Sequence, residues 1–171
     1  MRASITLLST LFLTLTFTGP ALAGGHPAER TNSSDTTPPQ PCTPQTVSPF
    51  RQEEIFYTLV DTLYVARTVS EAYTHFVEDF INHNPATVDG IASSFALVEP
   101  LFTNSNTAVK VQILHQAFVA PYGWVHYRID GFNPEPTAVV DVFRFDGSCV
   151  VEHWDIIQER PVNSTSSHPL F

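Results

Sequence analysis

The stretch that decides the fold is Asp141-Val-Phe-Arg-Phe-Asp-Gly-Ser-Cys-Val-Val-Glu-His-Trp-Asp-Ile-Ile-Gln158. Apolar residues alternate with polar ones on both sides of a tight turn, which predicts two antiparallel strands. The same alternation carries two Asp residues and a His. Acidic groups on a half-buried strand cost free energy unless they are paired or functional. We therefore expect this hairpin to line a pocket.

Two registers of this hairpin are open. With a two-residue turn at Asp146-Gly147, Asp141 lies opposite Glu152, and His153 and Asp155 point to the other face. With a three-residue loop over 146–148, Asp141 lies opposite His153, and Asp155 shares their face. The Asp-Gly pair slightly favours the shorter turn. Only the longer loop gathers the three side chains, inside an apolar wall of Val139, Phe143, Val151 and Ile157.

Three helices are predicted before the strands. Ser48-Pro49 is a capped helix start, and an apolar stripe at helical spacing follows it. A second helix is expected from Ser70, with an apolar face that runs to Phe80, and a third from about Val88 to Phe102. The period then changes to two, which predicts strands over 109–116 and 124–130 before the hairpin. Helices followed by antiparallel strands indicate an α+β fold.

The N-terminal region carries a targeting signal. Residues 1–23 are predicted to be a signal peptide, because an apolar run over 5–17 precedes Ala21-Leu-Ala. We therefore expect a secreted, extracellular protein with no membrane contact after cleavage. Residues 24–49 are rich in Gly, Pro, Ser and Thr, which predicts a disordered linker. The folded unit is then 50–161, followed by a flexible tail over 162–171.

Charge and cysteine content narrow the function classes. The net charge of −9 argues against nucleic acid and anionic membranes as partners, because phosphates are neutralised by Lys and Arg. Cys42 and Cys149 form an even pair, which suggests one disulfide in an oxidising compartment. Asn32 and Asn163 begin glycosylation sequons, and both lie outside the predicted folded unit.

Two blocks of sequence resemble the SnoaL-like polyketide cyclase family. They are Phe80-Ile-Asn-His-Asn-Pro85 and Val140-Asp-Val-Phe-Arg144 with Glu152-His-Trp-Asp-Ile-Ile-Gln158. The resemblance implies the nuclear-transport-factor-two-like (NTF2-like) cone, in which three N-terminal helices pack on a curved, mainly antiparallel sheet. It favours the longer hairpin loop. The turn departs from the family pattern, with Gly147 one place early, and Asp141 stands where members often carry His.

The resemblance also implies a reaction that needs no cofactor. The family performs an intramolecular aldol condensation, and Asp155 matches its acid/base position. A carboxylate in an apolar pocket is a stronger base than in water, because burial disfavours its charged form. We assign catalysis to Asp155, Asp141 and His153. Substrate binding is assigned to His83, His126, Phe143 and Val151.

Several alternatives remain beside this assignment. His83 could equally brace the loop before the third helix, and His115 is expected to be a hydrogen-bonded core residue. A metal is not expected, since no tight ligand spacing occurs. The predicted ligand is a hydrophobic carbonyl compound, and a hydrolase or a non-catalytic binding protein could use the same pocket. A homodimer is also a candidate assembly, formed through an outer sheet face that bears Ala138, Val140, Val142 and Trp154.

Overall fold

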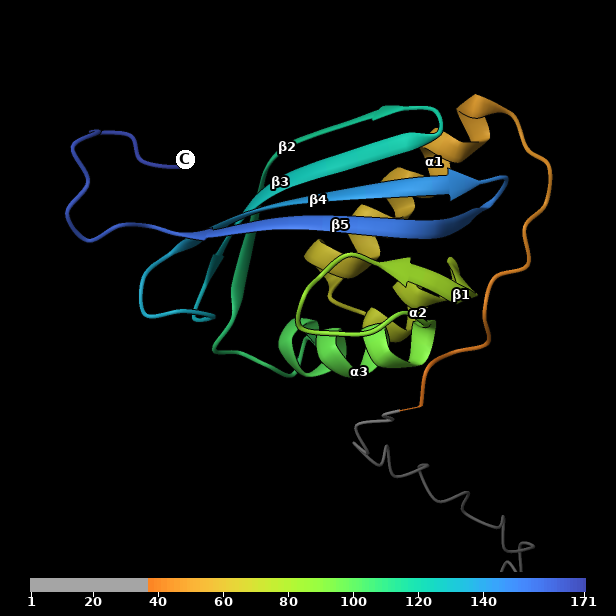
Figure 1. The fold of residues 1–171 in the computed structure, drawn as a ribbon, viewed down its shortest axis with the longest axis horizontal. Coiled ribbons are helices and arrows are strands. Elements are labelled where there is room, and N and C mark those ends of the chain that lie inside the picture. Colours follow the sequence, from red (N-terminus) through yellow and green to blue (C-terminus); the bar gives the residue numbers. More distant parts are fainter. Residues whose placement is uncertain (1–36) are drawn as a thin grey trace, which may run out of the picture. The chain divides into compact units, whose positions relative to one another are not determined.

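The computed structural model describes residues 37–171 (Figure 1). The predicted signal peptide over 1–23, the sequon at Asn32 and the first part of the predicted linker lie outside the described residues. Within the described range, no helix is both long and apolar enough to cross a membrane.

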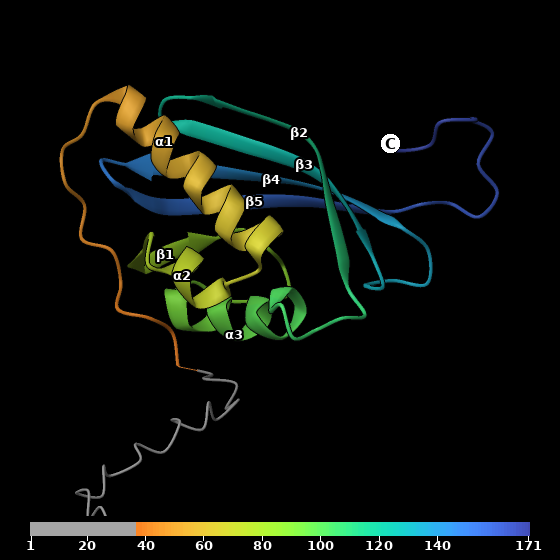
Figure 2. The ribbon, with the colours of Figure 1, turned by 180° about the vertical axis from the view of Figure 1, so that it is seen from behind.

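The described chain forms helices and one five-stranded sheet (Figures 1 and 2). The strand order is β1-β5-β4-β3-β2, with β1 parallel to β5 and every other pair antiparallel. Figure 2 shows α1 running across one face of the sheet, with α2 and α3 on the same side near β1. In chain order the elements are α1 (Pro49–Val60), the π-helical segment η1 (Asp61–Ala66), α2 (Val69–Tyr73), β1 (Phe76–Asn82), α3 (Ile91–Phe102), β2 (Lys110–Val119), β3 (Tyr122–Asp130), β4 (Thr137–Asp146) and β5 (Cys149–Glu159).

Helix α1 begins as the sequence predicts. The Ser48 hydroxyl accepts a hydrogen bond from the Arg51 backbone N–H at 3.2 Å, and a proline occupies the first turn. The buried stripe of the helix packs on the sheet. Phe56 comes so close to β3 that a Cβ on Gly123 would lie 2.4 Å from its ring. Any larger residue at position 123 would therefore push α1 away from the sheet.

The second predicted helix is wrong beyond Tyr73. Helix α2 ends there, and Phe76, Val77 and Phe80 belong to the strand β1. Their spacing fits either a helical stripe or a short buried strand, and a short apolar run does not separate the two by periodicity. Parallel pairing of β1 with β5 decides for the strand. The third predicted helix exists and begins at Ile91, slightly later than expected.

The hairpin β4–β5 adopts neither predicted register. Asp146 pairs with Cys149, so the turn consists of Gly147 and Ser148, with Gly147 at φ +52°. Glycine at the first central position is typical of a type II′ turn. Val151 is then an extra residue, a bulge between the Phe145–Val150 and Arg144–Glu152 pairs.

The bulge restores the face that the longer loop would have given. Beyond it Phe143 pairs with His153, and Asp141 pairs with Asp155. Because side chains alternate along a strand, these four residues all point to one face of the sheet. The predicted grouping is therefore correct, although it is produced by a short turn and a bulge.

Residues 37–48 lie against the domain, although their composition predicts a disordered linker. The predicted disulfide is present: Cys42 is bonded to Cys149, with their Cα atoms 5.9 Å apart. The Cys42 backbone N–H donates to the Phe76 carbonyl at 2.7 Å. The Ser148 N–H donates to the Gln45 carbonyl at 2.9 Å. A covalent bond and backbone hydrogen bonds hold this segment, so it needs little apolar surface of its own.

Candidate active site

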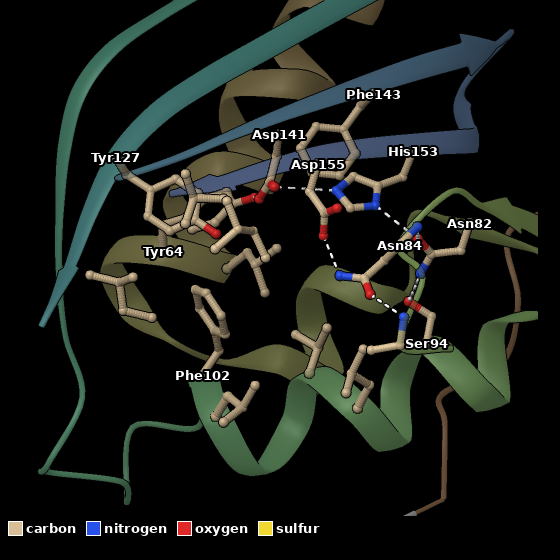
Figure 3. A pocket seen from close by; sticks show the side chains of 18 of the residues that line it. Tyr64, Asn82, Asn84, Ser94, Phe102, Tyr127, Asp141, Phe143, His153 and Asp155 are labelled. Atoms are coloured by element: carbon tan, nitrogen blue, oxygen red, sulfur yellow. Dashed lines mark hydrogen bonds and ion pairs between the residues drawn. The ribbon is translucent and has the colours of Figure 1, made fainter. Parts of the chain in front are cut away.

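The helix-covered side of the sheet contains a cavity of about 440 Å³ (Figure 3). This volume suits a small organic ligand. Phe132 and Ile157 line the cavity and are 39% and 44% exposed, so it opens to solvent near them. Most of its wall is apolar. The apolar part is formed by Leu63, Phe76, Phe80, Leu97, Val98, Leu101, Phe102, Ile129, Val139 and Phe143.

Asp141 is the most deeply buried acid of the cavity, with 6% of its surface exposed. The Tyr64 hydroxyl donates a hydrogen bond to its Oδ2. Burial, and then the nearby Asp141 carboxylate, raises the pKa of both Tyr64 and Tyr127 well above the ordinary value. Both phenols therefore stay protonated at neutral pH and serve as hydrogen-bond donors beside Asp141.

His153 lies between Asp141 and the end of β1. Its Nε2 is 3.4 Å from Asp141 Oδ1, and its Nδ1 is 3.1 Å from Asn82 Oδ1. The imidazole packs against Phe143, with ring centres 5.0 Å apart. Figure 3 shows the ring bridging these two partners. Contacts at both ring nitrogens fix the orientation of this side chain.

Asp155 also lines the cavity and is less buried than Asp141. The Asn84 side-chain amide donates to its Oδ2, and Asn84 Oδ1 in turn accepts from the Ala86 backbone N–H at 2.7 Å. This second bond sets which end of the Asn84 amide faces Asp155. Within the described chain no donor is bonded to Asp155 Oδ1, so one carboxylate oxygen is free for a ligand.

Asp141, His153 and Asp155 form a compact polar cluster in apolar surroundings. Ligand-type atoms of the three side chains all lie within 4.8 Å of one another, a spacing that could also hold a metal ion. No Lys or Arg is among the described residues that line the cavity. The cluster can therefore accept and donate protons, and it favours neutral or cationic ligands over anions.

Of the four residues predicted to bind the substrate, only some lie at the cavity. Phe143 lines the cavity, as predicted, whereas His83, His126 and Val151 do not. Val151 is the bulge residue and faces a second groove that includes Cys42. Its displacement follows from the bulge, which turns residue 151 out of the alternation.

His83 and His126 lie on the outer side of the sheet. His83 Nε2 is 2.8 Å from Glu152 Oε1, and its ring stacks on Trp154 with centres 4.8 Å apart. The bracing role considered for His83 fits this position better than the substrate-binding role. His126 is one residue from the inward-facing Tyr127, so alternation directs it outward.

The expectation that His115 is a core residue is wrong. His115 is exposed, and its Nδ1 is 3.2 Å from that of His126 on the neighbouring strand. A bulge at Leu114 between Ile113 and His115 moves it off the apolar face. On the outer face Arg144 Nε donates to Glu152 Oε2 at 2.7 Å.

The sequence prediction missed six polar residues among the described lining of the cavity: Tyr64, Tyr73, Asn82, Asn84, Ser94 and Tyr127. Tyr64 belongs to the apolar stripe that continues from α1, so its hydroxyl gave no signal. Asn82 and Asn84 flank His83 in the Asn-His-Asn-Pro block, in which His83 alone was predicted to bind the substrate. Ser94 on α3 bonds to both Asn82 and Tyr73. Only the pairing of β1 with β5 brings this block to the cluster.

No family model and no curated protein matches the chain. Solved structures do match. An NTF2-like protein of unknown function from Mesorhizobium loti is 13% identical, with a TM-score of 0.55, over 68% of this chain and 99% of its own. A candidate ketosteroid isomerase from Kribbella flavida is 15% identical, with a TM-score of 0.54, over 68% and 84%. AclR, a candidate hydroxylase from Streptomyces galilaeus, is 18% identical, with a TM-score of 0.52, over 67% and 83%.

These likenesses identify the architecture. The chain has the NTF2-like α+β fold, with a mostly antiparallel five-stranded sheet that encloses a cavity against its helices. The fold fits an enzyme or a binding protein. The residues of the cavity must therefore carry the argument about function.

Proposed function

We propose that this protein is a cofactor-independent acid/base enzyme that acts on a hydrophobic carbonyl compound, with Asp155 as the proton acceptor. The observation that carries the proposal is the cluster of Asp141, His153 and Asp155 within 4.8 Å in a mainly apolar cavity. The apolar wall lowers the effective dielectric constant around the acidic groups and so strengthens their electrostatic interactions. The reaction class is an aldol-type cyclisation or an isomerisation.

Each polar group has a role in this reaction. The free Oδ1 of Asp155 removes a proton from a carbon next to a carbonyl, and the electron pair of the C–H bond moves into an enolate. A proton returns to the product at another position, or to the alkoxide when the enolate attacks a second carbonyl. The buried Tyr64 phenol remains protonated and donates its one hydrogen to Asp141, so it stabilises the negative charge of that carboxylate.

A non-catalytic binding protein is the second candidate, and the size and apolar wall of the cavity favour it equally. Turnover separates the two. The purified protein and its Asp155→Asn variant are incubated with organic extract of the producing culture, and the compounds are followed by mass spectrometry. A compound that only the wild type converts supports the enzyme. A compound that both proteins bind and leave unchanged rejects it in favour of a carrier.

We also propose that the protein is secreted and that two copies associate. A disulfide suits an oxidising compartment, and Asn163 lies exposed in the tail, accessible to glycosylation.

On the outer sheet face Val140 and Val142 are half-buried, while Ile156 is 70% exposed. Ala138, which we expected on this strip, is buried. A monomeric mass in light scattering at micromolar concentration would count against association.

A further inference from the structure

The protonation of His153 can be read from its neighbours. The nitrogen Nδ1 faces Asn82 Oδ1 at 3.1 Å, and the nitrogen Nε2 faces Asp141 Oδ1 at 3.4 Å. A carbonyl-type oxygen and a carboxylate oxygen are both acceptors. Which ring nitrogen carries hydrogen therefore depends on whether the Asn82 amide presents its oxygen or its NH2 group to His153.

The orientation of the Asn82 amide is fixed by a peptide group. The Asn84 backbone N–H, which can only donate, lies 3.0 Å from Asn82 Oδ1. At the other end, Asn82 Nδ2 donates to Ser94 Oγ at 3.2 Å, and Ser94 Oγ pairs with the Tyr73 hydroxyl at 2.8 Å. Reversing the amide would place an NH2 group against the Asn84 N–H. The atom that faces His153 is thus an acceptor, and His153 Nδ1 carries hydrogen.

The hydrogen on Nδ1 also determines how Nε2, on the opposite side of the His153 ring, interacts with Asp141. With hydrogen on Nδ1, a neutral imidazole presents a lone pair at Nε2, which would face an acceptor-only carboxylate. One proton must therefore lie between His153 Nε2 and Asp141 Oδ1, because two lone pairs without a hydrogen between them would repel each other. Asp141 keeps its Tyr64 partner on the other oxygen. Asp155 shares the cluster, but no donor is bonded to its Oδ1 in the described chain.

We propose that Asn82 is a positioning residue that keeps a proton on the His153–Asp141 pair, so that His153 donates a proton to the substrate while Asp155 accepts one. This assignment rests on the proposed function. The substrate C–H bond breaks and its proton passes to Asp155. The proton at His153 Nε2 passes to the substrate oxygen or carbon that gains hydrogen. Transfer from Asp155 to His153 after product release then restores both groups, with no co-reactant.

The test measures the protonation of the two His153 ring nitrogens in the absence of any ligand. Long-range proton–nitrogen correlation spectra of the ¹⁵N-labelled protein show which ring nitrogen of His153 bears hydrogen, and the His153→Gln spectrum assigns its signals. We expect Nδ1 to be protonated in the wild type at neutral pH. Asn82→Leu removes the acceptor, so we expect Nδ1 to lose its hydrogen. Asn82→Asp keeps an acceptor and should retain the wild-type pattern.

Asn133→Leu is the matched control. Asn133 is a half-buried amide that donates to Thr137 Oγ1 at 2.9 Å and does not line the cavity, so its loss should leave His153 unchanged. An unprotonated Nδ1 in the wild type overturns the proposal, even if Asn82→Leu does not fold. An unchanged Nδ1 signal in folded Asn82→Leu also overturns it. Either result is independent of whether Asp155→Asn abolishes turnover, which tests the proposed function itself.

Discussion

The charge of the cavity makes a prediction about which ligands it admits. N-phenyl-1-naphthylamine and 1-anilinonaphthalene-8-sulfonate share one fluorescent framework and differ by a sulfonate. Asp141 and Asp155 both face the cavity, and no lining residue of the described chain is Lys or Arg. We expect the neutral compound to bind and the sulfonate to be rejected from the cavity.

The size of the discrimination follows from Coulomb's law. An anionic group about 5 Å from one carboxylate, at an effective dielectric constant of about 20, is repelled by about 3 kcal/mol. That energy corresponds to about a hundredfold weaker binding. Because the proton shared with His153 neutralises Asp141, Asp155→Asn removes the remaining negative charge and should recover most of this factor, while leaving the affinity for the neutral compound nearly unchanged.

Fluorescence titration with competition measures both affinities in the same cavity. The control is Asp79→Asn, which makes the same formal change at an exposed acid outside the cavity, and it should leave the ratio unchanged. The reasoning is refuted if the sulfonate displaces the neutral compound with similar affinity, or if Asp79→Asn and Asp155→Asn shift the ratio equally.

Three further predictions concern stability. Replacing Cys42 and Cys149 by Ala should lower the unfolding free energy by up to about 5 kcal/mol in urea, since the bond spans 107 residues, and a loss below about 1 kcal/mol would contradict this. Arg67→Met should cost about 3 kcal/mol in the same assay, because the guanidinium donates to five backbone carbonyls between residues 101 and 109, and a neutral effect would be inconsistent with those bonds. The pKa of Glu152 is lowered from 4.5, chiefly by hydrogen bonding to His83, so ionised Glu152 stabilises the fold above pH 4.5 and this stabilisation is lost as the pH falls through the folded-state pKa. Glu152→Gln should therefore flatten the acid decline of the unfolding free energy. An unaltered decline from pH 7 to about 3 would argue against this role.

Much of the fold could be predicted because alternation and helix caps are local signals. The start at Ser48, the hairpin and the α+β order all follow from residues that are neighbours in the chain. The strand β1 could not be predicted in this way. Phe76, Val77 and Phe80 fit a helix or a strand equally well, and only pairing with β5, some 70 residues later in the chain, decides.

Of the site, only the cluster of Asp141, His153 and Asp155 could be predicted from the sequence. Asp141, His153 and Asp155 stood out as polar residues in an alternating hairpin, and the resemblance selected their shared face. The bulge at Val151 that produces this face leaves no clear mark in the sequence. The role of Asn82 could not be predicted either, since it depends on a contact with His153 that forms only when β1 pairs with β5.

Proton abstraction by Asp155 is the central claim, and exchange with heavy water tests it most directly. A carbonyl compound recovered from the protein is returned to wild type and to Asp155→Asn in D2O, and deuterium at the carbon next to the carbonyl is measured by mass spectrometry. The account predicts incorporation with the wild type and little or none with Asp155→Asn. Equal incorporation with both proteins, or none with either, would contradict it.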